Sequence, residues 1–223
     1  MQELQLVVVS STLAIALLSF ILALFLTLKF KETGAASYLF WSLGMWFFTL
    51  GVVLEVLFAI GIYSQSIAAL YLFVVSFTVE LLALGSMQLV HSRSARIAYY
   101  SYCGFTTLIL LFYLFNSKIG NIIVTYVVFG SLPLPVVAAS SAITFPAAVL
   151  IALIAAISYV RSKSKKMLSI ILGVVIVSMA GTLYIASMPE FLYLSEFAGI
   201  FLLWFGFFDF DAVSKNRRQS KRG

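Results

Sequence analysis

Long apolar runs separated by short polar segments are the main pattern along this chain. Each run approaches or exceeds the roughly 20 residues that a helix needs to cross a bilayer. Backbone groups in hydrocarbon must be hydrogen-bonded internally, so each run predicts a transmembrane helix. The pattern therefore predicts an all-α integral membrane protein, a seven-transmembrane helix bundle that forms a single domain over residues 1–210. The expected helices cover residues 6–28, 36–63, 67–90, 97–115, 132–160, 167–188 and 189–210.

The segment between the fourth and fifth runs, residues 116–131, is too short to span as a helix. It contains the β-branched and aromatic run IIVTYVVF, bounded by Gly120 and Gly130, a composition that favours a strand. Three interpretations stay open: an external strand or short hairpin over the outer mouth, a re-entrant segment buried by protein, and an extended loop on the interface.

The positions of lysine and arginine predict the orientation of the bundle. All of the 14 basic residues except Lys118 follow the first, third, fifth or seventh helix. Cytoplasmic loops are enriched in these residues, so we expect the N-terminus outside and the C-terminus, with a basic tail at 211–223, in the cytoplasm. Losing or adding a span would break this alternation.

Composition narrows the class of protein and its partners. The chain is 63% hydrophobic and only 10% charged, which indicates a multi-pass protein of the plasma membrane. Its formal charge of +6 lies in the loops and tail, where anionic lipid headgroups are a better partner than nucleic acid. This composition is compatible both with a homo-oligomer and with a separate membrane partner subunit. The single Cys103 and single His91 argue against a disulfide, a metal site or a haem, so we expect no cofactor.

Three acidic residues fall inside the expected helices, at Glu55, Glu80 and Glu196. An ionised group in hydrocarbon costs at least a few kcal/mol, so each should face the bundle interior, a partner or water. Since no lysine or arginine lies in the spans, we expect either a protonated acid that donates a hydrogen bond or a carboxylate that binds a cation. At about 1.5 Å per residue, Glu55 and Glu196 lie roughly 12 Å and 10 Å below the outer face and Glu80 roughly 20 Å, which allows a polar path inward.

Small residues on the faces that carry these carboxyl groups predict close helix packing. Gly44 and Gly51 share a helix face with Glu55, and Gly199 shares one with Glu196. Because glycine lets another backbone approach closely, we expect these faces to be helix-packing seams.

Pro146 lies inside the fifth helix and removes one backbone hydrogen bond, which predicts a kink. We expect Ser140, Ser141 and Thr144 to cap the freed carbonyl groups. The kink could be a static bend or a gating hinge.

Two parts of the chain resemble each other. Expected helices two and three contain LGMWFFTLG, LYL and LLALG, and helices six and seven contain LGVVIVSMAG, LYL and LLWFG in the same order. This similarity predicts a 3+1+3 internal repeat. Chance similarity between leucine-rich helices is the alternative.

Function follows only in outline from these features. No G-x-S-x-G, H-E-x-x-H or P-loop motif is present, and the last helix has no lysine for a retinal Schiff base, so we expect no catalytic residues and no enzyme. The leading hypothesis is a small transporter or channel-like protein whose intramembrane glutamates bind a proton, a cation or a polar solute. The alternatives are a sensory or partner-binding membrane subunit without transport, and a structural subunit.

Overall fold

The computed structural model describes residues 2–120, 122–124, 127–128, 132–163, 166, 168–170, 172–173, 176 and 189–207. Its helices are α1 (Gln2–Thr33), α2 (Ala36–Ala59), α3 (Gln65–Met87), α4 (Arg93–Asn116), α5 (Leu134–Ser162) and α7 (Pro189–Phe207). Helices α1 to α5 are each long and apolar enough to cross a membrane, so the prediction of a helical membrane protein is confirmed at this level. Most of the expected sixth helix, 167–188, and all of the tail, 211–223, lie outside the described residues.

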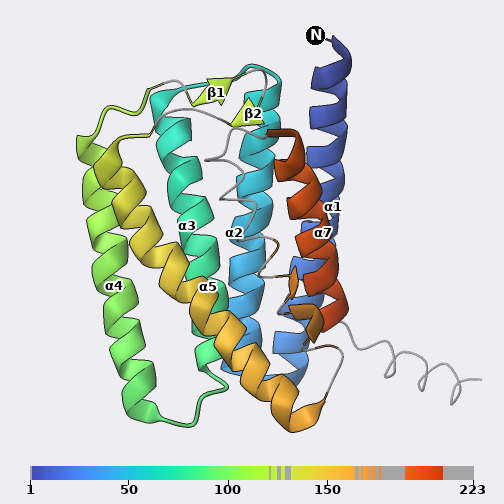
Figure 1. Ribbon diagram of the computed structural model, residues 1–223, viewed down its shortest axis with the longest axis vertical. Coiled ribbons are helices and arrows are strands. Elements are labelled where there is room, and N and C mark those ends of the chain that lie inside the picture. The colour runs from blue at the N-terminus through green and yellow to red at the C-terminus, as the bar shows by residue number, and fades with distance from the viewer. Residues whose placement is uncertain are drawn as a thin grey trace, which may run out of the picture.

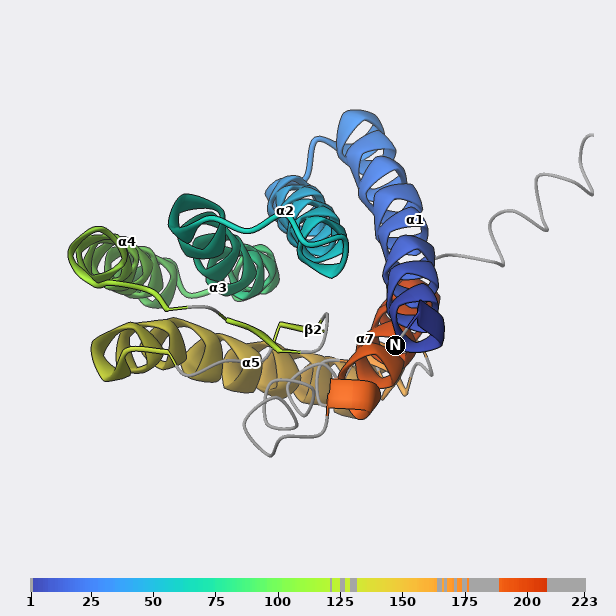
Figure 2. The same ribbon diagram turned by 90° about the horizontal axis from the view of Figure 1, so that it is seen from above.

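The first four helices stand side by side in chain order, each antiparallel to the next (Figures 1 and 2). Helix α5 runs obliquely across α3 and α4, and α7 lies against α1. We call the end at which α1 finishes and α2 begins the basic end, because Lys29, Lys31, Arg93 and Arg96 lie in or beside its turns. The opposite end, where α2 finishes and α3 begins, is the hairpin end.

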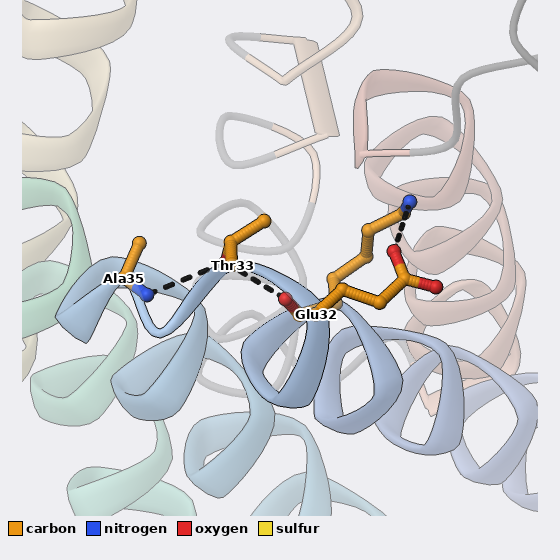
Figure 3. Close-up of polar contacts among 4 residues, drawn as sticks. Glu32, Thr33 and Ala35 are labelled. Atoms are coloured by element: carbon orange, nitrogen blue, oxygen red, sulfur yellow. Dashed lines mark hydrogen bonds and ion pairs between the residues drawn. The ribbon is translucent and has the colours of Figure 1, made fainter.

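A tight turn joins α1 to α2 at the basic end (Figure 3). Gly34 adopts a φ of 66°, in the left-handed region that glycine enters without steric cost. The Thr33 hydroxyl donates to the Lys29 carbonyl at 2.7 Å and accepts from the Ala35 N–H at 3.3 Å. Lys29 also pairs with Glu32 at 2.7 Å, an exposed ion pair that adds little stability. The turn therefore reverses the chain within a few residues and keeps α1 and α2 adjacent.

The described residues of the segment between α4 and α5 lie at the hairpin end (Figure 1). Strand β1 (Ile123–Val124) pairs antiparallel with β2 (Val127–Val128), and β2 contacts α2. The structure thus shows the hairpin among the interpretations of residues 116–131. Ile119 and Ile122, just before β1, are buried in an apolar cluster with Leu54, Phe58 and Tyr71 of α2 and α3.

Helix α5 continues through Pro146, and its freed carbonyl has a partner on another helix. The carbonyl that Pro146 leaves without its helical donor belongs to Ala142, four residues earlier. The Tyr102 hydroxyl of α4 donates to this oxygen. The expectation that a serine or threonine of α5 caps it is wrong, because the Thr144 hydroxyl bonds the Ser140 carbonyl at 3.1 Å instead. Tyr102 therefore connects α4 to α5 at the position where α5 lacks one of its own backbone hydrogen bonds.

Helices α2 and α3 approach closely at Gly44. A Cβ atom added there would lie 3.0 Å from the Leu82 side chain and 3.3 Å from the Thr78 carbonyl oxygen. At Gly51 the nearest atom would be 3.4 Å away, on Val74, which is ordinary contact. This seam is therefore tighter at Gly44 than at Gly51.

A similar close approach joins the described part of residues 166–176 to α7. A Cβ atom at Gly173 would lie 3.0 Å from the Gly199 carbonyl oxygen and 3.0 Å from the Leu203 side chain. At Gly206 it would lie 2.3 Å from Ile170. Both glycines therefore allow α7 to pack against the chain that follows α5.

Candidate functional site

Glu55 lies near the hairpin end of α2, closer to the helix end than the sequence indicated. Helix α2 ends at Ala59 rather than at residue 63, so Glu55 is about 6 Å from the end instead of roughly 12 Å. Gly61, at a φ of 87°, ends the helix: its N–H bonds the Phe58 carbonyl and the Ile62 N–H bonds that of Leu57. This is the Schellman pattern, which requires the left-handed conformation at that glycine.

The Glu55 carboxyl group is buried between α2 and α3, with a residue exposure of 4%. The Tyr71 hydroxyl of α3 donates to Glu55 Oε1 at 2.6 Å. Glu55 Oε2 is also buried, and no donor among the described residues reaches it. One carboxyl oxygen is therefore held and the other is available to a proton or ligand.

Glu80 has a similar arrangement between α3 and α4. It lies fifteen residues beyond Gln65, about 22 Å along α3, and is 1% exposed. The Thr107 hydroxyl of α4 donates to Glu80 Oε2 at 2.6 Å. The Cys103 thiol and, next to it, Tyr99 lie beside the carboxyl group, but Oε1 has no hydrogen-bond partner in the described chain.

The two carboxyl groups lie on opposite sides of α3. Tyr71, which holds Glu55, and Glu80 are nine residues apart, which at 3.6 residues per turn places them on opposite helix faces. Ser76 lies one turn from Glu80 and hydrogen-bonds Ser140 of α5, with 2.8 Å between the hydroxyl oxygens. The described residues therefore form two separate carboxyl sites, with a polar contact to α5 beside the second.

The third candidate, Glu196, lies in α7. Its side chain falls outside the described residues, so it can be placed only by its helix and its position one turn before Gly199. Gly199 itself is buried against Gly173.

No protein-family model, curated protein or solved structure matches this chain. The chemistry of the site follows from its geometry alone. Within the described residues no group of three or more histidine, cysteine or acidic side chains could hold a metal ion. Each carboxyl group can take up a proton, accept a hydrogen bond from a solute, or give one ligand to a cation.

Sequence reasoning missed the residues that hold the two glutamates. Neither Tyr71 nor Thr107 was singled out, and Cys103 was considered only for a disulfide, a metal site or a haem. The available signal was the spacing of Tyr99, Cys103 and Thr107, which recur every four residues in α4 and so share a helix face. That spacing indicates a polar stripe along α4, although it does not indicate which helix the stripe faces.

An apolar groove of about 460 Å³ opens on the surface toward the basic end. Met87 and Val90, at the end of α3, form one wall, and residues 145–154 of α5 supply the others. Neither Glu55 nor Glu80 lines it. The groove and the carboxyl sites are therefore distinct features.

Proposed function

We propose that this chain is a small transporter or channel-like protein in which Glu80, with Glu55 and Glu196, binds a proton, a cation or a polar group of a solute. The observation that carries the proposal is the half-bonded state of Glu55 and Glu80, each with one oxygen held by a hydroxyl group and the other unpaired. A buried polar atom without a partner costs about 1–3 kcal/mol. A bound proton or cation relieves that cost, because no lysine or arginine reaches these oxygens in the described spans.

Glu80 is the better candidate for the central site. It lies deepest from the hairpin end, and Thr107, Cys103 and the Ser76–Ser140 pair surround it with polar atoms from α3, α4 and α5. Three helices meet there, so a small shift of α4 or α5 changes the environment of the carboxyl group. Glu55 would act as a second site on the hairpin side, under the cluster that contains Ile119 and Ile122.

The orientation that supports this mechanism has seven spans, with the N-terminus outside and the C-terminus in the cytoplasm. Basic residues of the described turns gather at one end, and Lys118 lies at the other. The end of α7 lies next to Lys166, since a Cβ atom at Gly206 would be 3.1 Å from the Lys166 carbonyl oxygen. Helices α5 and α7 therefore finish at the basic end, opposite the start of α1, which supports an odd number of spans with the two termini on opposite sides of the membrane.

The 3+1+3 repeat is supported by matching contacts. In the two similar sequence segments, the glycines that allow close approach and the residues that they meet occupy equivalent positions. The equivalent pairs are Gly44 and Gly173, Thr78 and Gly199, Leu82 and Leu203, Gly85 and Gly206, and Trp41 and Ile170. Chance similarity in leucine-rich helices would not reproduce which residues touch.

Flux through reconstituted protein tests the mechanism. In liposomes under an imposed pH gradient, proton movement would be followed with an entrapped pH dye, and sodium and potassium with ion indicators. Glu80→Gln keeps the side-chain size and an acceptor for Thr107 but removes the titratable group, so we expect flux to fall at least about tenfold. Glu32→Gln, the same change at an exposed site of the α1–α2 turn, is the matched control and should leave flux unchanged. Equal flux in wild type and Glu80→Gln would contradict the proposal.

The competing function is a partner-binding or sensory subunit without flux. One observation favours it: the open groove described above is apolar and touches neither carboxyl group. Such a subunit would co-purify with a stoichiometric partner protein and show no ion movement in liposomes. That combination would replace the transport proposal.

A further inference from the structure

Helices α4 and α5 diverge toward the basic end (Figure 1), and the groove lies there between α5 and the end of α3. Tyr102 joins the two helices at Ala142, one turn before the groove begins at Phe145. Beyond Pro146 the buried face of α5, with Ala147 and Ile151, joins the core cluster that contains residues of α1, α2 and α7. Helix α4 does not follow it, so the groove lies beside the end of α3, where Met87 and Val90 line it.

The shape and lining of the groove suit a hydrocarbon chain. Phe145, Val149 and Leu153 follow one another at four-residue spacing and are 72%, 42% and 58% exposed. The lining stretch, residues 145–154, covers about 14 Å of α5. Over that length a volume of about 460 Å³ accommodates an extended acyl chain.

Two arginines at the start of α4 lie close in sequence and in height to the end of α3 that lines the groove. Glu80 of α3 and Cys103 of α4 are neighbours, and these helices are antiparallel. Met87 and Arg96 each lie seven residues, or about 10 Å, further toward the basic end, so they are level with each other on the facing sides of α3 and α4. Arg93 follows Val90 by three residues, which limits their Cα atoms to about 11 Å apart.

Among the described residues, no carboxylate neutralises the charge of these arginines. Arg96 Nε is buried without a hydrogen-bond partner, and neither Arg93 nor Arg96 forms an ion pair with a carboxylate of the described residues. They also lie in the first turn of α4, whose backbone N–H groups favour an anion. An anionic group at this end therefore meets two cations and a helix N-terminus directly beside an apolar groove.

We propose that this groove binds one anionic phospholipid, with an acyl chain along α5 and its phosphate at Arg93 and Arg96. Two arginines without a carboxylate partner among the described residues, beside an apolar groove, match a phosphate joined to an acyl chain, and a partner helix is an alternative outcome of the test. The site is separate from the carboxyl sites, so the lipid proposal does not depend on the transport proposal.

Lipid retention by the full chain tests this site. Protein would be reconstituted in bilayers of equal phosphatidylglycerol and phosphatidylcholine, extracted in mild detergent, and its bound lipids counted by native mass spectrometry. We expect the wild-type protein to retain one phosphatidylglycerol molecule in preference to phosphatidylcholine. Arg93→Gln with Arg96→Gln should weaken that binding about 30-fold, because each arginine near an anionic surface contributes about one kcal/mol. Val149→Trp should fill the groove and prevent both phosphatidylglycerol and phosphatidylcholine from binding there.

Matched controls separate the site from general attraction to the membrane. Lys31→Gln removes a charge at the same end but on α1, and Leu108→Trp enlarges a side chain on the exposed face of α4, 68% exposed. Both should retain phosphatidylglycerol as wild type does, with unchanged thermal unfolding in all variants. The proposal would be overturned if the double arginine variant kept its preference for phosphatidylglycerol, or if Lys31→Gln lost as much of that preference. It would also be overturned if Val149→Trp dissociated a dimer without changing lipid retention.

Discussion

Single hydroxyl groups from neighbouring helices position both buried carboxyl groups. Tyr71 and Thr107 each donate to one oxygen at 2.6 Å. Hydrogen bonds between membrane helices contribute only about 0.6 kcal/mol on average, so these contacts orient the glutamates more than they stabilise the fold. The stability of the bundle depends more on how closely its helices pack, and glycine positions control that packing.

At Gly85 of α3 a single methyl group should measurably destabilise the protein. A Cβ atom there would lie 2.4 Å from Cδ1 of Trp41. The ring nitrogen of Trp41 donates to the Leu82 carbonyl at 3.2 Å. Gly85→Ala must displace the indole ring, and such overpacking costs about 1–3 kcal/mol. Thermal unfolding in detergent should show the loss.

The control for this change is Gly104→Ala on α4, where an added Cβ meets nothing within 4 Å. It should leave stability unchanged or raise it by up to about 1 kcal/mol, because alanine is the better helix former. If the repeat is real, Gly206→Ala should behave like Gly85→Ala, since its Cβ would meet Ile170 at 2.3 Å. A neutral Gly85→Ala would show that the seam is looser than described.

At the scale of the element, α5 depends on α4 to complete its backbone hydrogen bonding. Pro146 leaves the Ala142 carbonyl without a helical donor, and Tyr102 supplies one from outside the helix. This contact makes the proline site of α5 a junction between two helices. It also marks where the groove opens.

A double-mutant cycle tests whether Tyr102 serves the proline site. Tyr102→Phe should lower the free energy of unfolding by about 1 kcal/mol, because it leaves the Ala142 carbonyl unpaired. In a Pro146→Ala background the new backbone N–H bonds that carbonyl, so the same tyrosine change should cost almost nothing. Unfolding of the four proteins in detergent gives the coupling energy, and equal effects of Tyr102→Phe in both backgrounds would refute the link.

At the scale of the whole molecule, the turns divide into a basic end and a hairpin end. Five apolar helices, α1 to α5, are long enough to place these ends on opposite sides of a bilayer. Basic turns resist translocation, so the basic end should be cytoplasmic.

Labelling of introduced cysteines checks this orientation. With Cys103 replaced by serine, Ser66→Cys places a thiol at the exposed hairpin end and Ser94→Cys places one at the exposed basic end. A membrane-impermeant maleimide should label the first in intact cells and the second only after permeabilisation. Labelling of Ser94→Cys in intact cells would reverse the topology.

The sequence pattern predicted the helices better than their ends. The apolar runs located α1 to α5 because a backbone in hydrocarbon must bond within its own helix, a local requirement. The end of α2 was placed four residues too late, because residues 60–63 continue the apolar run while Gly61 turns the backbone. Hydrophobicity does not report that change of backbone conformation.

The sequence by itself determined the class of protein, the spans α1 to α5 and the burial of Glu55 and Glu80, since all of these follow from transfer of side chains and backbone out of water. Only the tertiary structure decided which partners these residues have. Tyr71 and Thr107 lie sixteen and 27 residues away from their glutamates along the chain, and Tyr102 lies 40 residues from Ala142. Such pairs depend on the register and rotation of packed helices, which no local pattern encodes. The same rotation placed the two carboxyl groups on opposite sides of α3.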